Sequence, residues 1–536
     1  MCKVVALDTK LYCVIFQLGT ELKLKMSPIR ILAIILVVLT ISTSSDTRAA
    51  YTEKPSYNYT YADISHRIKM SEMRIALGGS VILTPKEQKA NEILMSIKRD
   101  EIYKGEKNPD DYPPSMHFFK AKPLIRQSEI FRIIQKMPKG SFLHGHNTGM
   151  VSSRWIIKNL TYQFNVLTCF DSRGVLLFTF RNSSKCATPL KSVCIERLRS
   201  KDKEKFDKQL EKHINLYNAR PEAFISEPHK IWAQFEQIFD TVNDFYKYVP
   251  VFRAYHRRML EELYEDNVLY AEIRMPLSSL YGTNRTFSKV DVADEVEKIV
   301  NDFRRTHPDF LGLKVIFAKR NKATKKQMAE YVNEFVDVFA QKKHFVIGFD
   351  LIGNEEIGDP LEKFIEELMQ LPRDAKFFFH AGETKWYGRT DWNMLDAILL
   401  NTKRIGHGYA LPKHPNIWDA VVKKRIGIEL NPISNQVLGL VWDLRNHPGS
   451  YFFASDLPIV ISADDPGIWN AKGLSYDFYY AFMSLASADA DLRTLKKLAL
   501  NSIELSVLTN TERRELKTLF TKKWDIFLDY VINFHR

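Results

Sequence analysis

The stretch SFLHGH, residues 141–146, is a short apolar run that ends in two histidines. Seven similar runs follow it, rich in apolar, β-branched or aromatic residues: NVLYAEIRM (267–275), GLKVIFA (312–318), FVIGFDL (345–351), KFFFHAG (376–382), RIGHG (404–408), IGIELN (426–431) and IVISADD (459–465). Amphipathic stretches of helix length, such as DVADEVEKIVNDFRRTH (291–307), lie between them. Eight strands that alternate with helices predict an α/β fold whose parallel sheet closes as a (β/α)8 barrel of the TIM type.

The interval between the first two runs is too long for a single crossover helix. We therefore expect an insertion within the barrel, at residues 160–230, between strands 1 and 2. Cys169 and Cys186 fall in it and predict a small strand-containing lobe closed by a disulfide. The alternative is that both thiols stay free and buried. If they pair, Cys194 is left as a free thiol in the mature chain.

The N-terminus carries a targeting pattern. ILAIILVVLTI, residues 31–41, has the length of a signal-peptide core and lies between Arg30 and a run of small residues. Residues 1–49 are therefore predicted to be a signal peptide, with an uncut anchor as the alternative and Met26 as an alternative start. Four glycosylation sequons agree with a secreted, extracellular protein that keeps no membrane span: Asn58, Asn159, Asn182 and Asn284.

Two further regions follow the leader. Residues 50–126 are polar and helix-forming and end in the turn-rich KGEKNPDDYPPS, so they predict a helical arm before the barrel at residues 127–536. Lys and Arg number 77 against 64 Asp and Glu, a net charge of +13. This excess attracts polyanions such as a glycosaminoglycan or nucleic acid at long range, but a well-solvated surface is the preferred interpretation. We keep a glycosaminoglycan as a possible partner and do not expect DNA.

Histidines and one aspartate stand at the ends of predicted strands. In a (β/α)8 barrel these ends converge on one face, and residues 144 and 146 point to the same side of an extended strand. His144, His146, His380 and Asp464 therefore predict one metal site, and three imidazoles with one carboxylate suit a single Zn²⁺ per subunit. Barrels with two metals often use a lysine at the end of strand 4, and residues 348–356 contain none.

Three other polar residues lie at the same strand ends. A metal with an open position lowers the pKa of bound water. We expect Glu383 to protonate a substrate atom as water adds, and His407 to orient or deprotonate that water. Asp465 could accept a hydrogen bond from a heterocycle. The alternative for each of the three is a salt bridge or a loop cap.

Six motifs, in this order and spacing, resemble the adenosine deaminase family: MPKGSFLHGH, GFDLIG, FFFHAGET, RIGHGYAL, NPISNQVL and ISADDPGIW. The match is closest to its secreted branch, the adenosine deaminase-related growth factors, and runs from about residue 115 to about residue 530. The resemblance implies hydrolytic deamination of adenosine and 2'-deoxyadenosine at one zinc. It also implies a homodimer formed through the arm, and an insertion that contacts receptors or glycans.

The resemblance also assigns roles residue by residue. His144, His146, His380 and Asp464 match the zinc ligands, Glu383 matches the donor to N1 of the purine, and His407 matches the group that acts on the zinc-bound water. Gly353 and Asp465 match residues that bond the purine, while Trp232 and Glu236 match the stretch that closes over the nucleoside. All six chemical positions are retained in this sequence.

Two positions depart from the family's pattern. Asn147 stands where aspartate is usual, and Arg320 stands near the place of a usual histidine. Aspartate is expected to bond the ribose 5'-hydroxyl. Its loss therefore predicts transition-state binding weakened on the order of 1 kcal/mol, up to roughly tenfold, without abolition of activity. Three hypotheses follow: an active secreted deaminase that limits extracellular adenosine and cell growth, a growth-factor-like or glycan-binding protein with weak or no activity, and a deaminase of another purine nucleoside or nucleotide.

Overall fold

The computed structural model describes residues 60–181, 186–187, 193–199, 202–224, 227–282 and 284–534. The chain divides into two units, Met1–Met70 and Ser71–Arg536. In the first unit, the described residues begin helix α3 (Tyr61–Ile75). The predicted signal peptide, residues 1–49, and the sequons at Asn58 and Asn182 lie outside the described residues. The second unit contains the sheets and all the candidate metal and catalytic residues.

All eight predicted runs contain β-strand, and every pairing between them is parallel. They form two sheets, ordered β1-β5-β6-β7-β8 and β9-β10-β11-β12. The fifth run supplies two short strands, one to each sheet. The bounds are β1 (Gly140–Phe142), β5 (Val268–Met275), β6 (Gly312–Arg320), β7 (Val346–Ile352), β8 (Lys376–Phe377), β9 (His380–Ala381), β10 (Arg404–His407), β11 (Gly427–Leu430) and β12 (Ile459–Ile461).

The two sheets join along both of their edges. At one edge, Phe378 N–H donates to the Phe349 carbonyl over 3.1 Å, which continues β7 alongside the fifth run. At the other edge, a parallel bridge pairs Gly145 with Asp464, just beyond β1 and β12. The first and last runs are thereby connected, and the predicted (β/α)8 barrel is confirmed.

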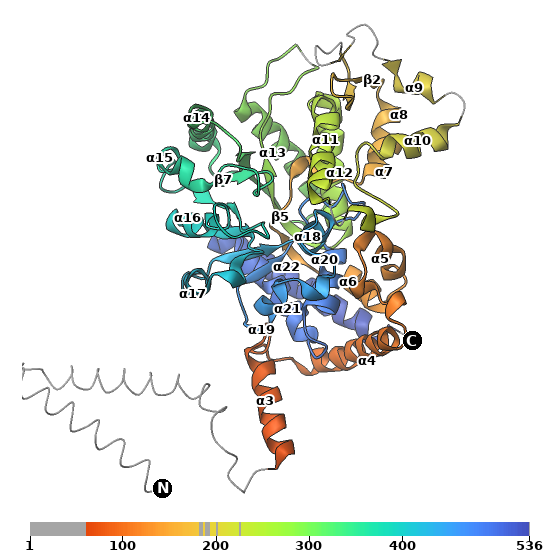
Figure 1. Ribbon diagram of the computed structural model, residues 1–536, viewed down its shortest axis with the longest axis vertical. Coiled ribbons are helices and arrows are strands. Elements are labelled where there is room, and N and C mark those ends of the chain that lie inside the picture. Colours follow the sequence, from red (N-terminus) through yellow and green to blue (C-terminus); the bar gives the residue numbers. More distant parts are fainter. Residues whose placement is uncertain are drawn as a thin grey trace, which may run out of the picture. The chain divides into compact units, whose positions relative to one another are not determined.

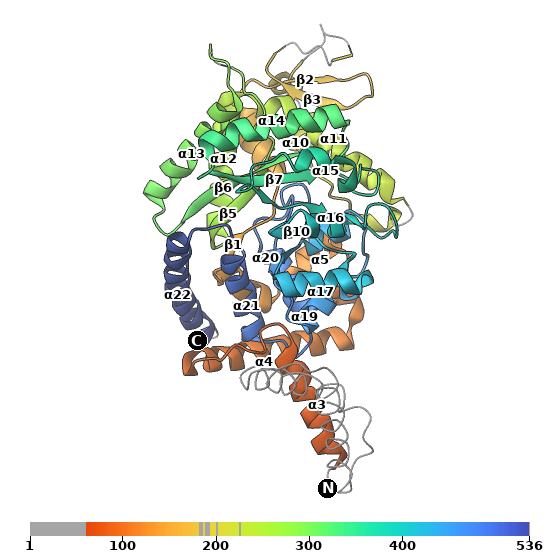
Figure 2. The ribbon, with the colours of Figure 1, turned by 90° about the vertical axis from the view of Figure 1, so that its left-hand side faces the viewer.

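Helices cover the outside of the barrel. Figure 2 shows β5, β6 and β7 side by side, with helices α12 (Val249–Glu265), α13 (Lys289–Thr306) and α14 (Lys325–Lys342) outside them. In α13, Val292, Val296, Val300 and Phe303 form one buried stripe with helical spacing. Capping boxes begin two of these helices, Ser288 with Asp291 in α13 and Thr324 with Gln327 in α14.

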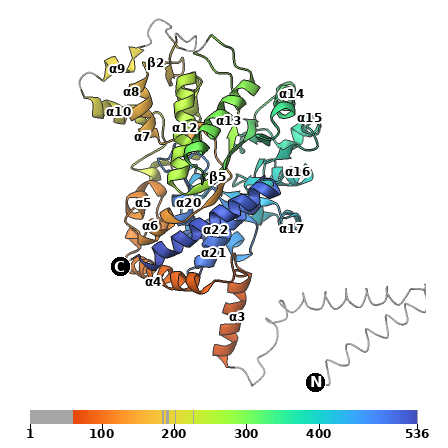
Figure 3. The same ribbon diagram turned by 180° about the vertical axis from the view of Figure 1, so that it is seen from behind.

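Part of the predicted arm packs against the end of the chain. Three helices contact one another: α4 (Pro85–Lys107), α21 (Leu492–Glu504) and α22 (Asn510–Ile532). Figure 3, which views the ribbon from behind, shows all three. The buried Glu87 accepts from Trp524 Nε1 at 2.8 Å and pairs with Lys496 Nζ at 2.5 Å. These contacts hold α4 against the outer helices of the barrel.

The expected lobe is inserted in the sequence between β1 and β5, and Figure 1 shows it at the top of the view. Strands β2 (Leu167–Phe170), β3 (Leu176–Thr179) and β4 (Val193–Cys194) form an antiparallel sheet ordered β3-β2-β4. Cys169 and Cys186 are joined by a disulfide, which confirms the predicted pairing, and Cys194 forms no disulfide among the described residues. The side chains of Val175 and Leu177 pack with the two bonded cysteines as a small separate core.

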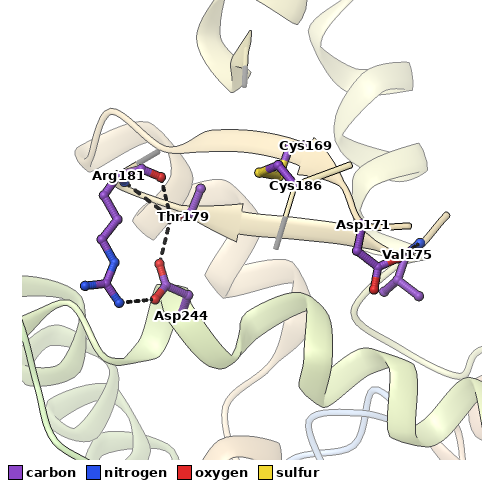
Figure 4. The surroundings of a disulfide bond; sticks show 7 residues. All are labelled: Cys169, Asp171, Val175, Thr179, Arg181, Cys186 and Asp244. Atoms are coloured by element: carbon purple, nitrogen blue, oxygen red, sulfur yellow. Dashed lines mark hydrogen bonds and ion pairs between the residues drawn. A yellow bond between two sulfur atoms is a disulfide. The ribbon is translucent and has the colours of Figure 1, made fainter. Parts of the chain in front are cut away.

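The lobe is fastened to helix α11 (Pro228–Tyr246), as Figure 4 shows. Thr179 Oγ1 donates to Asp244 over 2.6 Å, and the Arg181 guanidinium binds the same carboxylate at 2.8 Å. Phe178 packs edge-on against Phe245, with 5.8 Å between the ring centroids. The lobe and α11 therefore share both polar and apolar contacts.

Candidate metal and active site

The four predicted metal ligands lie together at the C-terminal ends of the barrel strands. His144 and His146 follow β1, His380 lies in the two-residue strand β9 near the end of the fifth run, and Asp464 follows β12. One ligand atom from each of the four lies within 4.8 Å of the others. The Asp464 Oδ1 oxygen is 3.0 Å from His146 Nε2 and 3.4 Å from His144 Nε2.

Buried carboxylates behind two of the histidines set their orientation. His144 Nδ1 lies 2.6 Å from Glu429 Oε2, and His380 Nδ1 lies 2.7 Å from Asp350 Oδ2. A carboxylate accepts the proton on Nδ1, so each ring turns the lone pair of Nε2 toward the common centre. The Arg274 guanidinium binds both carboxylates, at 2.7 Å each. Burial raises the pKa of Glu429, but Arg274 and then Arg404 outweigh burial and hold the pKa well below its usual range.

The donor atoms fit a metal ion. Among the described residues, His144 Nε2 and Asp464 Oδ1 are buried without a hydrogen-bond partner, and both belong to the four-residue cluster. Burial lowers the pKa of His146 to about 4, so its ring is neutral at pH 7 and can supply a lone pair. Burial raises the pKa of Asp464, but the neighbouring His144 and His146 imidazoles outweigh burial and hold this pKa well below its usual range. An N₃O set of this kind suits zinc or a related divalent ion.

Glu383 and His407 lie beside the metal cluster. Glu383 Oε1 is 3.5 Å from His407 Nδ1, and His407 Nε2 is 3.8 Å from Asp464 Oδ2. Burial, and then the charge of Asp464, raise the pKa of Glu383 well above its usual range. The backbone N–H groups of Gly382 and Glu383 donate to the buried Glu355 at 3.0 and 2.5 Å, which fixes the loop that carries Glu383. Glu383 is therefore suited to donate a proton.

Two site residues adopt backbone conformations that L-amino acids rarely use. His407 has a φ of 65° and Asp464 a φ of 60°. Such left-handed backbone costs on the order of 1–3 kcal/mol and persists only where surrounding contacts enforce it. Helix α18 (Pro432–Val437) provides two of them, since Ser434 Oγ donates to Asp464 Oδ2 at 2.7 Å and Asn435 Nδ2 lies 3.0 Å from His407 Nδ1.

A cavity of about 340 Å³ opens onto these residues. Its volume falls within the range of small-molecule sites. Asn147, Trp232, Gly353 and Asp465, all predicted to bind substrate, line it. Glu236, also predicted to bind substrate, does not line the cavity; it pairs at 3.2 Å with Arg320, which does. The structure thus gathers four of the five predicted substrate residues around one cavity, and the fifth, Glu236, forms an ion pair with Arg320 of the cavity wall.

Sequence reasoning assigned no role to several residues that hold the site. Asp350 and Glu429 are fully buried charges within otherwise apolar strands, and Arg274 lies on β5 between them. A charged residue inside a buried strand requires a partner. The sequence therefore indicated that these three residues pair with other charges, but their spacing did not show which residues are the partners. Glu355 and Asn435 lie in a loop and a short helix, where no periodic pattern distinguishes them.

Two predicted glycosylation sites can be located on the surface. Asn159 and Asn284 are exposed, and Asn159 Nδ2 donates to the Trp155 carbonyl at 3.0 Å. In the part of the chain that the structure describes, no helix is both long enough and apolar enough to cross a membrane.

Comparison with known proteins identifies the family of this chain. The family model described as adenosine deaminase matches residues 212–523, and one described as adenosine/AMP deaminase N-terminal matches residues 33–134. Adenosine deaminase 2 of Homo sapiens is 41% identical over 471 residues, which cover 86% of this chain and 91% of the relative. Adenosine deaminase of Lutzomyia longipalpis is 39% identical over 462 residues, covering 85% and 90%.

Solved structures share the fold. The Arabidopsis N6-mAMP deaminase has a TM-score of 0.51 at 18% identity and covers 73% of this chain and 99% of its own. Arabidopsis ADAL complexed with IMP has a TM-score of 0.52 at 17% identity, with 74% and 99% covered. With the family models and the relatives of about 40% identity, the conclusion is that this chain belongs to the adenosine deaminase family of enzymes.

Proposed function

We propose that the protein is a secreted, zinc-dependent adenosine deaminase that regulates extracellular adenosine and cell growth. Water adds to C6 of adenosine or 2'-deoxyadenosine, and ammonia leaves to give inosine or 2'-deoxyinosine. The observation that carries the proposal is the convergence of three histidines and Asp464 within 4.8 Å, beside the buried Glu383, at the wall of one cavity that His146, His380, Asp464 and Glu383 line.

The chain would hold one zinc ion through His144, His146, His380 and Asp464. When bound, zinc lowers the pKa of water and so supplies a nucleophile at neutral pH. Glu383, kept protonated by burial, donates its proton to N1 of the purine, which prepares C6 for addition. His407 acts on the attacking water from the side of Asp464, to which its Nε2 is 3.8 Å distant.

Recognition of the nucleoside is assigned to the residues that line the cavity. Gly353 and Asp465 bond the purine, while Trp232 supplies an apolar wall. Asn147 is buried at the cavity wall and bonds the ribose through its amide. Because a neutral amide replaces a carboxylate, we expect an affinity for the nucleoside about tenfold lower than with aspartate at this position. The residues that carry out the reaction itself are unaffected.

The remaining assignments concern the whole protein. A signal peptide at residues 1–49, an arm at residues 50–126 that forms a homodimer, and a barrel at residues 127–536 are proposed from the sequence pattern and the family. The lobe within residues 160–230 is proposed to contact a receptor or a glycosaminoglycan, which agrees with the net charge of +13. Glycans are proposed at Asn58, Asn159, Asn182 and Asn284.

Product analysis tests the proposed reaction. Purified, zinc-loaded protein should convert adenosine to inosine and release one ammonia for each inosine formed. Rates on 2'-deoxyadenosine and AMP, measured beside adenosine, identify the preferred substrate. A preference for AMP would favour the nucleotide alternative, in which Arg320 at the cavity wall binds the phosphate.

A second candidate function is growth-factor-like or glycan-binding activity with weak or no deamination. It is favoured by the Arg320–Glu236 ion pair beside the cavity and by the neutral Asn147. The variant Glu383→Ala separates the two, because it removes the proton donor and leaves the lobe unchanged. If the variant promotes cell growth as well as the wild type does, catalysis is not the basis of that effect.

A further inference from the structure

His407 is held by a chain of buried hydrogen bonds that runs away from the metal cluster. Its Nδ1 atom lies 3.0 Å from Asn435 Nδ2, and Asn435 Oδ1 lies 2.9 Å from His447 Nε2. His447 Nδ1 in turn lies 2.8 Å from the backbone nitrogen of Gly449. His407, Asn435 and His447 are each no more than 1% exposed, so water does not compete for these bonds.

The last hydrogen bond of this series, between Gly449 and His447, sets the donor and acceptor of every other bond in it. A backbone N–H can only donate, so Gly449 makes His447 Nδ1 an acceptor. Burial lowers the pKa of His447 to about 3, so the ring is neutral and carries its single proton on Nε2. The same ring packs edge-on against Tyr409, with 5.2 Å between the centroids, which holds it in this orientation.

The direction then passes to the amide of Asn435. Because His447 Nε2–H donates, the atom of Asn435 that faces it must be the carbonyl oxygen. The amide therefore presents its NH₂ group to His407 Nδ1, which must accept. A neutral His407 ring consequently carries its proton on Nε2. The other groups nearby are Glu383 Oε1, 3.5 Å from Nδ1, and Asp464 Oδ2, 3.8 Å from Nε2.

We propose that Asn435 and His447 are positioning residues that fix His407 as the Nε2–H tautomer, so that it presents a hydrogen-bond donor to the attacking water oxygen. The inference rests on the proposed deaminase function. It distinguishes the two roles expected for His407: a ring with its proton on Nε2 orients the oxygen and stabilises its negative charge, and cannot take a proton at that atom. An oriented donor of this kind contributes on the order of 10²- to 10³-fold to kcat.

The tautomer can be observed directly in the zinc-loaded enzyme. Nitrogen NMR of protein labelled with ¹⁵N-histidine distinguishes protonated from unprotonated ring nitrogens, and the spectrum of His407→Gln assigns the His407 signals. The wild type should show a protonated Nε2 and an unprotonated Nδ1. A proton on Nδ1 of wild-type His407 would overturn the proposal.

Substitution of Asn435 tests the cause. Asn435→Asp has the same shape, but its carboxylate can only accept, so Nδ1 of His407 should gain a proton. We expect kcat at pH 8 to fall on the order of 10²- to 10⁴-fold, as when a catalytic histidine is held in the wrong tautomer, with KM changed less than threefold and zinc content unchanged. An unchanged kcat, or an unchanged His407 spectrum, would contradict the proposal.

Two further variants keep the test decisive. Gln436→Glu introduces the same chemical change one residue away on α18, where the side chain hydrogen-bonds the Phe118, Met116 and Trp442 backbones instead of His407. It should lower stability and leave the His407 spectrum and kcat per folded enzyme as they are; a loss of kcat like that of Asn435→Asp would refute a specific role of Asn435.

If Asn435→Asp does not fold, His447→Phe removes the directing donor and should give His407 in both tautomers with a lower kcat. Absence of deamination by the wild type would refute the proposed function, while the tautomer is still measured.

Discussion

Replacing Asp350 with asparagine should weaken metal binding although no metal ligand is substituted. The carboxylate accepts three hydrogen bonds, from His380 N at 3.0 Å and from His380 Nδ1 and Arg274 Nε at 2.7 Å each. An asparagine can keep its oxygen toward the last two, but its NH₂ group then faces the His380 backbone N–H. One buried donor is left unpaired and two bonds lose their charge assistance, so the variant should be destabilised by about 3 kcal/mol.

The same change acts on the metal through His380. Loss of the carboxylate behind a ligating histidine lowers metal affinity about 10- to 100-fold, which competition with a chelator of known affinity would measure. Thermal unfolding of the metal-free and metal-loaded forms separates the loss of fold stability from the loss of affinity. Asp374→Asn is a matched control, because that carboxylate is exposed and lies 3.8 Å from Lys343 at the surface. Zinc affinity of Asp350→Asn within twofold of the wild type would refute the reasoning.

Four other predictions follow from the structure. Asn147→Asp should raise kcat/KM for adenosine about tenfold by restoring a charge-assisted hydrogen bond; a fall in steady-state kcat/KM would contradict this. Glu383→Gln should lose at least 10²-fold in kcat while its zinc content, measured by elemental analysis, stays at one per chain. Replacing both Cys169 and Cys186 with serine should destabilise the lobe by about 3 kcal/mol for the 17-residue separation, seen as faster proteolysis there, with near-normal kcat. Burial lowers the pKa of Lys98 from 10.5 to about 7. Between pH 7 and 10.5 the unfolded chain therefore binds more protons than the folded chain, so the free energy of unfolding should rise with pH. Chemical denaturation of Lys98→Met across this pH range should show a shallower rise of the free energy of unfolding.

The barrel could be predicted from the sequence because strand-forming runs are recognised from neighbouring residues alone. The eight runs are short and apolar, β-branched or aromatic in character, and helical stretches separate them, so their number predicted closure. The candidate ligands could be chosen for the same reason. His144, His146, His380 and Asp464 follow or end predicted strands, and parallel strands in a barrel end on one face.

The contacts that orient these side chains were not predictable in the same way. Arg274 binds Asp350 and Glu429, which lie 76 and 155 residues away in sequence. Such pairs exist only after the barrel closes, and one sequence does not indicate which buried charges meet. The left-handed backbone at His407 is equally hidden, because a histidine at that position carries no marker comparable to glycine.

Titration of the metal-free protein with zinc tests the central claim most directly. Adenosine turnover and bound zinc would be measured on the same samples. We expect no turnover without metal, a linear rise with added zinc, and a plateau at one zinc per chain, held by His144, His146, His380 and Asp464. Full activity in the metal-free protein, or no turnover with one zinc demonstrably bound, would contradict it.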